Sequence, residues 1–191
     1  MTEINVDAAV VAVRDYALEQ ECPTAYVVAY GAAVAAQLGH PITDPLIAAA
    51  QSELGEEAVQ HVAAWVADAL PHIRRAADVL TQLEELDLSA GAIPELALPY
   101  RRAAQAVALA TGKSVAQAAW AGAAAVCRAA RLYAGVADLA GAITAGDPVA
   151  RAAHLQVPDT ELIAVATWTG QHWAEIDTVV GSGEMPAADH P

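Results

Sequence analysis

Carboxylate and imidazole side chains recur along one segment at a spacing that could support chemistry. Glu57, His61, Trp65, Asp68 and His72 are separated by four, four, three and four positions, so a helix would place them on one face. A carboxylate and an imidazole one turn apart could bind a divalent metal ion or act as acid and base. A polar face opposite an apolar stripe is more often simply solvated, and we favour that interpretation.

A second set of such residues lies near the end of the chain. Glu161, Trp168, His172 and Glu175 are separated by seven, four and three positions. Trp168 and His172 fall between the expected core side and the solvent side of their helix, so they could form the rim of a ligand pocket or simply pack there. If the two polar faces met, they would form a metal site. Its ligands would be His61, Asp68, His72, His172 and Glu175.

Arginines form the third candidate site. Arg128 and Arg131 lie three positions apart in a long Ala-rich segment, and a buried arginine needs a carboxylate, a carbonyl or an anionic ligand. We favour an internal ion-pair network with the acids at 84–87. The alternatives are a pocket for a small carboxylate or phosphate, completed by Arg101 or Arg102, and a surface for a protein partner.

Other familiar site patterns are missing from the sequence. There is no Gly-x-Gly-x-x-Gly, P-loop, Gly-x-Ser-x-Gly, His-Glu-x-x-His or Glu-x-x-His, which removes the common nucleotide, hydrolase, zinc-protease and di-iron signatures. Cys22 and Cys127 are too far apart for a metal motif. Tyr26 and Tyr30, one helical turn apart, are expected to pack the first two helices together and could line an apolar pocket.

Helix-capping residues, proline and glycine divide the chain into elements that would position these side chains. No run alternates apolar and polar residues long enough to form a strand, so the prediction is all-α. Pro71 should kink or break its helix, and 87–99 should be irregular. The expected helices cover 5–19, 23–39, 44–55, 56–85, 99–112, 114–144, a short stretch from 147, and 159–181.

The segment at 115–144 is the expected centre of the fold. Apolar residues recur there with 3-4-3-4 spacing, which is a heptad seam suited either to internal packing or to a homodimer. Because polar side chains are few all round this helix, we expect it to be buried. The seam positions are Val115, Ala118, Gly122, Ala125, Ala129, Leu132, Val136, Leu139 and Ile143.

Composition excludes several classes of protein. The chain has 191 residues, 56% of them hydrophobic, and a net charge of −14, so we expect neither disorder nor nucleic-acid binding. The charge is uneven: residues 1–95 carry −12, residues 96–137 carry +5 and residues 138–191 carry −7. No stretch is long and apolar enough to span a membrane, and no secretory signal is visible at the start.

Together these patterns predict one compact all-α bundle of eight or nine helices around the 115–144 helix. Residues 1–180 should form a single domain, followed by a flexible tail at 181–191. We expect a cytoplasmic, non-catalytic protein without a cofactor. It would bind a small ligand, for which an anion is one option, or a protein partner, and would self-associate. The alternative is a small helical enzyme with a metal or acid–base site built from histidine and carboxylate.

Overall fold

A computed structural model describes residues 4–86, 93–136 and 147–183. The described residues contain nine α-helices, one short 3-10 helix and no strand, which confirms the predicted all-α class and helix number. The chain divides into two compact units, residues 1–90 and residues 91–191. The expectation of a single domain over 1–180 stays a prediction.

Four helices form the first unit, and their starts follow the predicted caps. The Asn5 side chain accepts a hydrogen bond from the Ala8 backbone N–H at 3.1 Å, and Asp44 accepts one from Leu46 at 2.9 Å. Both bonds satisfy donors that a helix start leaves unpaired. The helices are α1 (Val6–Glu19), α2 (Thr24–Gln37), α3 (Pro45–Leu54) and α4 (Glu56–Leu86).

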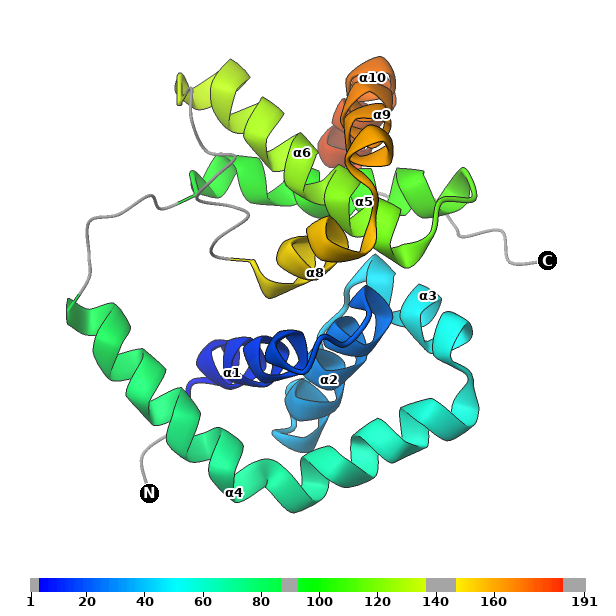
Figure 1. Cartoon of the computed structure of the whole chain (residues 1–191). Helices are drawn as coiled ribbons and strands as arrows, with labels where there is room; N and C mark the ends of the chain where they lie inside the picture. Colours follow the sequence, from blue (N-terminus) through cyan, green and yellow to red (C-terminus); the bar gives the residue numbers. More distant parts are fainter. Residues whose placement is uncertain (1–3, 87–92, 137–146, 184–191) are drawn as a thin grey trace. The chain divides into compact units, whose positions relative to one another are not determined.

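The core of this unit is made of small side chains where α1 and α2 meet α4. In Figure 1, α4 runs along both α1 and α2. Ala9 and Val13 of α1, Val34 of α2 and Val66 of α4 are almost fully buried together. Alanine and valine keep the helices close, because they add little bulk between two backbones.

Pro71 lies inside α4 without ending it. The helix continues from Glu56 to Leu86, and its axis changes direction near its middle (Figure 1). A proline removes one backbone hydrogen bond and crowds the preceding turn. Of the two predicted outcomes, a kink or a break, the helix therefore shows the kink.

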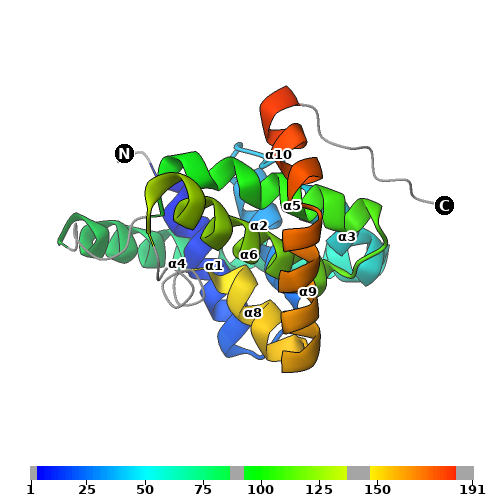
Figure 2. The ribbon, with the colours of Figure 1, turned by 90° about the horizontal axis from the view of Figure 1, so that it is seen from above.

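The second unit is built on a pair of antiparallel helices. A short turn with the Ser114–Gln117 capping box joins α5 to α6. Helices α8 and α9 pack against α6, and α10 packs against α5 (Figure 2). The elements are η1 (Glu95–Ala97), α5 (Leu98–Ala110), α6 (Val115–Ala134), α8 (Pro148–Gln156), α9 (Asp159–Gln171) and α10 (Trp173–Ser182).

Helix α6 ends earlier than the sequence pattern predicted. It stops at Ala134 rather than near Thr144, because Gly135 adopts a left-handed conformation with φ 68°. The Val136 N–H then bonds the Ala130 carbonyl at 3.2 Å, which is the usual glycine-terminated helix end. The seam is buried from Val115 through Ala129 but exposed at Leu132 and Val136, and its positions 139 and 143 lie outside the described residues.

The predicted last helix is also two helices. The chain turns at His172, so that α9 packs on α6 while α10 packs on α5. One straight helix could not bury its apolar side against both neighbours. The tertiary packing therefore overrides a sequence pattern that runs without interruption from 159 to 181. The prediction for the tail concerns mainly residues 184–191, which lie outside the described part.

None of the described helices has both the length and the apolar composition required to cross a membrane.

Candidate functional site

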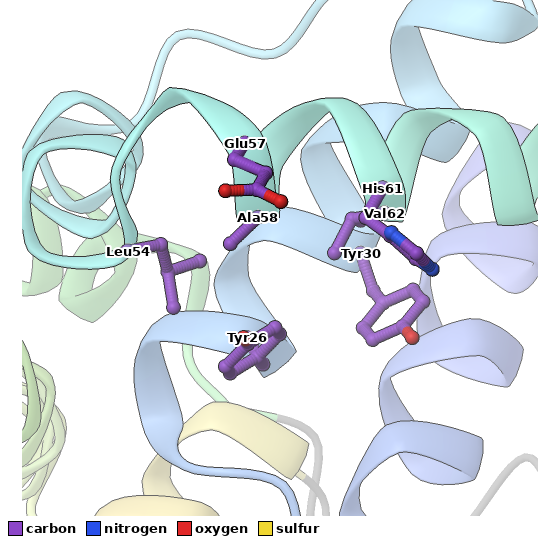
Figure 3. Close-up of a pocket in the computed structure, with 7 residues that line it drawn as sticks. All are labelled: Tyr26, Tyr30, Leu54, Glu57, Ala58, His61 and Val62. Carbon is purple, nitrogen blue, oxygen red and sulfur yellow. The ribbon is translucent and has the colours of Figure 1, made fainter.

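A hollow between α2 and α4 gathers several of the predicted residues in the first unit (Figure 3). Its volume is about 360 Å³, which is within the usual range for small-ligand sites. Glu57 and His61 come from one face of α4, and Tyr26 and Tyr30 come from one face of α2. The lining residues are Tyr26, Tyr30, Leu54, Glu57, Ala58, His61 and Val62.

Local geometry explains why these side chains meet. Residues four apart lie one above the other on a helix. Tyr26 and Tyr30 therefore share one face of α2, and Glu57 and His61 share one face of α4. Gly55 has a φ of +79°, a conformation that favours glycine, and it lets α4 start directly after α3 ends. This sharp join brings Leu54 to the edge of the hollow beside the first turn of α4 (Figure 3).

An aromatic cluster supports one side of the hollow. The Trp65 ring stacks on Tyr16 with 5.0 Å between ring centres, and it meets the edge of Tyr30 at 5.2 Å. Burial raises the pKa of Tyr30, and repulsion from Cys22, Tyr16 and Tyr26 adds to this. The Tyr30 hydroxyl therefore keeps its proton at neutral pH and can donate a hydrogen bond.

The predicted metal ligands are not gathered within either unit. Asp68 and His72 are exposed and take no part in the hollow, although they share the polar face of α4 with His61. The described residues contain no group of three histidine, cysteine, aspartate or glutamate side chains that could hold a metal ion. A meeting of that face with His172 and Glu175, which belong to the other unit, stays a prediction.

Trp168 and His172 interact with each other in the second unit. Their rings stack at 4.4 Å, and His172 Nδ1 lies 3.0 Å from the Trp168 carbonyl oxygen. Because a carbonyl can only accept, Nδ1 carries the hydrogen of this bond. Lys113 Nζ lies 4.8 Å from the centre of the Trp168 ring. Glu175 is exposed on α10. These contacts match the packing interpretation of the border residues.

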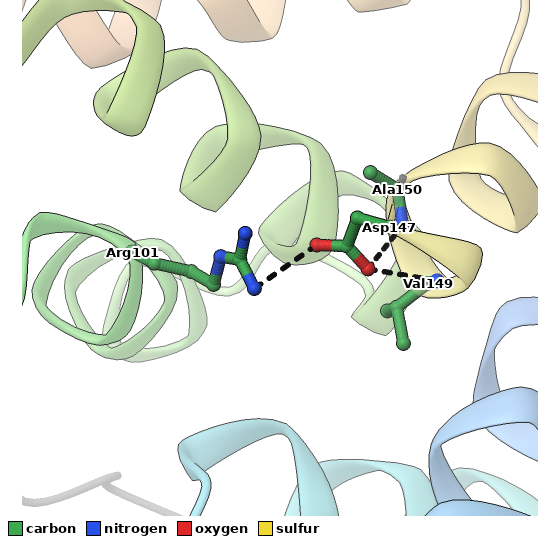
Figure 4. A network of polar contacts seen from close by, with 4 residues as sticks. All are labelled: Arg101, Asp147, Val149 and Ala150. Carbon is green, nitrogen blue, oxygen red and sulfur yellow. Dashed lines mark hydrogen bonds and ion pairs between the residues drawn. The ribbon is translucent and has the colours of Figure 1, made fainter. Parts of the chain in front are cut away.

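Arg101 meets one of the protein's own carboxylates. Its Nη1 lies 3.2 Å from Asp147 Oδ2, and Asp147 Oδ1 accepts hydrogen bonds from the Val149 and Ala150 N–H groups (Figure 4). Asp147 therefore caps α8 and ties it to α5 at the same time. Arg102, the alternative partner in the predicted anion pocket, is exposed.

The predicted internal ion-pair network required the other two arginines to be buried, and the structure does not bury them. Arg128 and Arg131 are both exposed on α6, because the buried side of this helix is formed by its alanines and valines. The Arg128 guanidinium lies over the Trp173 ring, 5.1 Å from its centre. The acids expected at 84–87 lie outside the part whose side chains the structure describes.

The second unit also contains a polar cluster that the sequence did not reveal. The Tyr100 hydroxyl donates to Asp177 Oδ1 at 2.7 Å, and the Tyr133 hydroxyl donates to the same oxygen at 3.3 Å. Tyr100 stacks on Trp173 with 5.0 Å between ring centres. Burial raises the pKa of Tyr100 well above its ordinary value, and the hydrogen bond to Asp177 raises it further. No local spacing connects these residues.

No protein-family model, curated protein or solved structure matches this chain.

Proposed function

We propose that the protein is a non-catalytic binding protein that holds a small organic ligand in the hollow between α2 and α4. The observation that supports this is a set of polar groups without partners around one cavity. Within the described residues, the side chains of Glu57 and His61 and the hydroxyls of Tyr26 and Tyr30 form no hydrogen bond or ion pair. Glu57 and His61 are exposed and Tyr26 and Tyr30 are half-buried, so a bound ligand would replace water as the partner of these groups.

Binding is favoured over catalysis because His61 is not held in place. A histidine acting as general base is usually oriented by a second group on its other ring nitrogen. In the part of the chain that the structure describes, His61 forms no such bond. His172 does form one, with the Trp168 carbonyl oxygen, but it belongs to the second unit and does not line the hollow. The small helical enzyme with a histidine and carboxylate site therefore remains the alternative.

Self-association remains a proposal of lower rank. The seam from Val115 to Ala129 is buried within the second unit, so a dimer through this stretch would have to displace existing helix contacts. Light scattering of the purified chain would decide this point, since a monomer would limit the seam to internal packing.

A variant that fills the hollow tests the proposed function. Ala58 lines the cavity, and Ala58→Phe should abolish binding of every ligand found by ligand-observed NMR in a library of small organic compounds. Ala67→Phe is the matched control, because Ala67 is exposed and lies nine positions along α4, on the opposite side of the helix. Ligands that bind Ala58→Phe as well as the wild type, or a library without ligands, would contradict the proposal.

A further inference from the structure

We infer that the ligand of this hollow is an organic cation, such as a protonated amine on an aromatic or aliphatic body. The inference rests on the proposed function and specifies the chemistry of the same site. Three observations carry it: the charge on the lining, the presence of two aromatic rings in the lining, and the charge of the unit as a whole.

The lining contains a carboxylate and no basic side chain. Glu57 contributes a negative charge, and neither lysine nor arginine is among the lining residues. Arg14 of α1 lies against Gly31 and lines no part of the hollow. Arg74 follows Glu57 by 17 positions on α4, which is about 26 Å along the helix and well beyond a Debye length of about 8 Å at physiological salt. No lining side chain would offset the repulsion between a bound anion and Glu57.

Two aromatic rings complete the site for a cation. Figure 3 shows the rings of Tyr26 and Tyr30 on α2 and the side chains of Glu57 and His61 on α4 around the same hollow. The face of an aromatic ring attracts a cation through its quadrupole. An ammonium group in the hollow would lie among the two tyrosine rings and the Glu57 carboxylate, which line the same space. A ring nitrogen of neutral His61 can accept a hydrogen bond from the same ammonium group.

The charge of the first unit favours the same ligand. Residues 1–90 carry 14 acids and three bases, a net −11, whereas residues 91–191 carry nine acids and six bases, a net −3. A surface with one dominant sign raises the local concentration of ions of the opposite sign. The unit that contains the hollow therefore attracts cations and repels anions before any contact forms.

Glu57 also has a structural role that the test must separate from binding. It lies in the first turn of α4, as does Glu56, and a carboxylate there is stabilised by the helix dipole. Glu56 accepts a hydrogen bond from Gln60 at 3.0 Å and does not line the hollow. Glu56→Gln and Glu57→Gln therefore remove the same charge from the same turn, and only the second removes a charge from the hollow.

Three probes of similar size and different charge test the inference: 2-phenylethylammonium, 2-phenylethanol and 3-phenylpropionate. Their dissociation constants are measured by NMR titration of the full chain. The ammonium should bind about tenfold more tightly than the alcohol, and the carboxylate should bind most weakly. Glu57→Gln should weaken ammonium binding about fivefold and leave the alcohol unchanged. Glu56→Gln should change either by less than about twofold.

The outcomes separate the two proposals. Equal binding of ammonium and alcohol, both lost in Ala58→Phe, would overturn the cation inference while the hollow remained a binding site. Tighter binding of 3-phenylpropionate would indicate an anion instead. Equal effects of Glu56→Gln and Glu57→Gln would reduce the inference to a general attraction by an acidic surface. If none of the three probes binds, the inference is wrong, and the library screen with Ala58→Phe decides the proposed function independently.

Discussion

The hollow of the first unit and the polar cluster of Tyr100, Tyr133 and Asp177 in the second unit use the same kinds of residue in opposite ways. In the second unit, Tyr100 and Tyr133 both donate to Asp177, and Tyr100 stacks on Trp173. In the first unit, Tyr30 and Glu57 line one cavity but form no hydrogen bond with each other or with any other described residue. One region has satisfied its polar groups internally, and the other has left them open.

This difference shows how a structural use of tyrosine and carboxylate can be separated from a binding use. Partnered groups in a stack contribute to stability, so their removal should cost free energy of unfolding. Unpartnered groups around a cavity contribute little to stability, so their removal should change binding and leave the fold intact. The two regions can therefore be compared by the same measurement, urea unfolding followed by circular dichroism.

The largest expected effect is on the stacked tyrosine. Tyr100 is only 8% exposed, and Tyr100→Ala should lower the free energy of unfolding by about 3 kcal/mol, because it leaves a cavity and removes the stack on Trp173. Tyr26→Ala, at the edge of the hollow, should cost about 1 kcal/mol from lost apolar area. Equal losses in the two variants would mean that the hollow is as tightly packed as the stack.

A smaller effect is expected where Gly122 of α6 packs against Gln105 of α5. A Cβ on Gly122 would lie 2.9 Å from Cγ and Nε2 of Gln105, a side chain that is buried. Gly122→Ala should lower the free energy of unfolding by about 1 kcal/mol, since overpacking of about 2 kcal/mol exceeds the roughly 1 kcal/mol that alanine adds to a helix.

Two further variants distinguish close packing from a general effect of glycine. Gly181 lies in α10 with open space around it, and Gly181→Ala should raise the free energy of unfolding by about 0.5 kcal/mol. In a Gln105→Ala background, Gly122→Ala should become stabilising as well. If Gly122→Ala stabilises the wild-type protein, the Gln105 side chain has room to move, and the close fit of this region is not a constraint.

Local signals in the sequence predict most of the helices and one half of the site. Asn5, Asp44 and Ser114 cap helices where expected because a cap depends only on residues within one turn. The spacing of Glu57 with His61 and of Tyr26 with Tyr30 likewise identifies which side chains share a face. It does not reveal that these two faces enclose one cavity, since this depends on how α2 packs on α4.

The features that the sequence missed depend on contacts between distant segments. Tyr100 and Asp177 are 77 positions apart, and no periodicity connects them. Gly135 lies between the seam positions Leu132 and Val136 and does not interrupt the apolar spacing, and only its left-handed backbone ends α6. The turn at His172 follows from α9 and α10 packing on different helices. A hydrophobic pattern records which side of a helix is buried, but not which neighbour buries it.

The smallest expected effect concerns Asp177, the carboxylate that accepts hydrogen bonds from Tyr100 and Tyr133. This effect also depends on pH. Asp177→Asn keeps an oxygen that can accept from Tyr100 but removes its charge, so the free energy of unfolding should fall by about 0.5 kcal/mol at neutral pH. Glu57→Gln, which breaks no hydrogen bond among the described residues, should leave it unchanged. A larger loss in Glu57→Gln would show that the polar groups of the hollow stabilise the fold after all.

The raised pKa of Tyr100 sets the direction of the pH effect. The folded protein holds this hydroxyl in its neutral form more strongly than the unfolded chain, in which tyrosine titrates near its ordinary value of 10. The neutral stack therefore contributes its full stability below pH 10, and this contribution is lost as the pH rises above 10. Asp177→Asn removes the negative charge that opposes ionisation, so the variant should lose less stability than the wild type over this range. If the two proteins lose the same free energy of unfolding as the pH rises above 10, burial alone, without Asp177, keeps Tyr100 protonated.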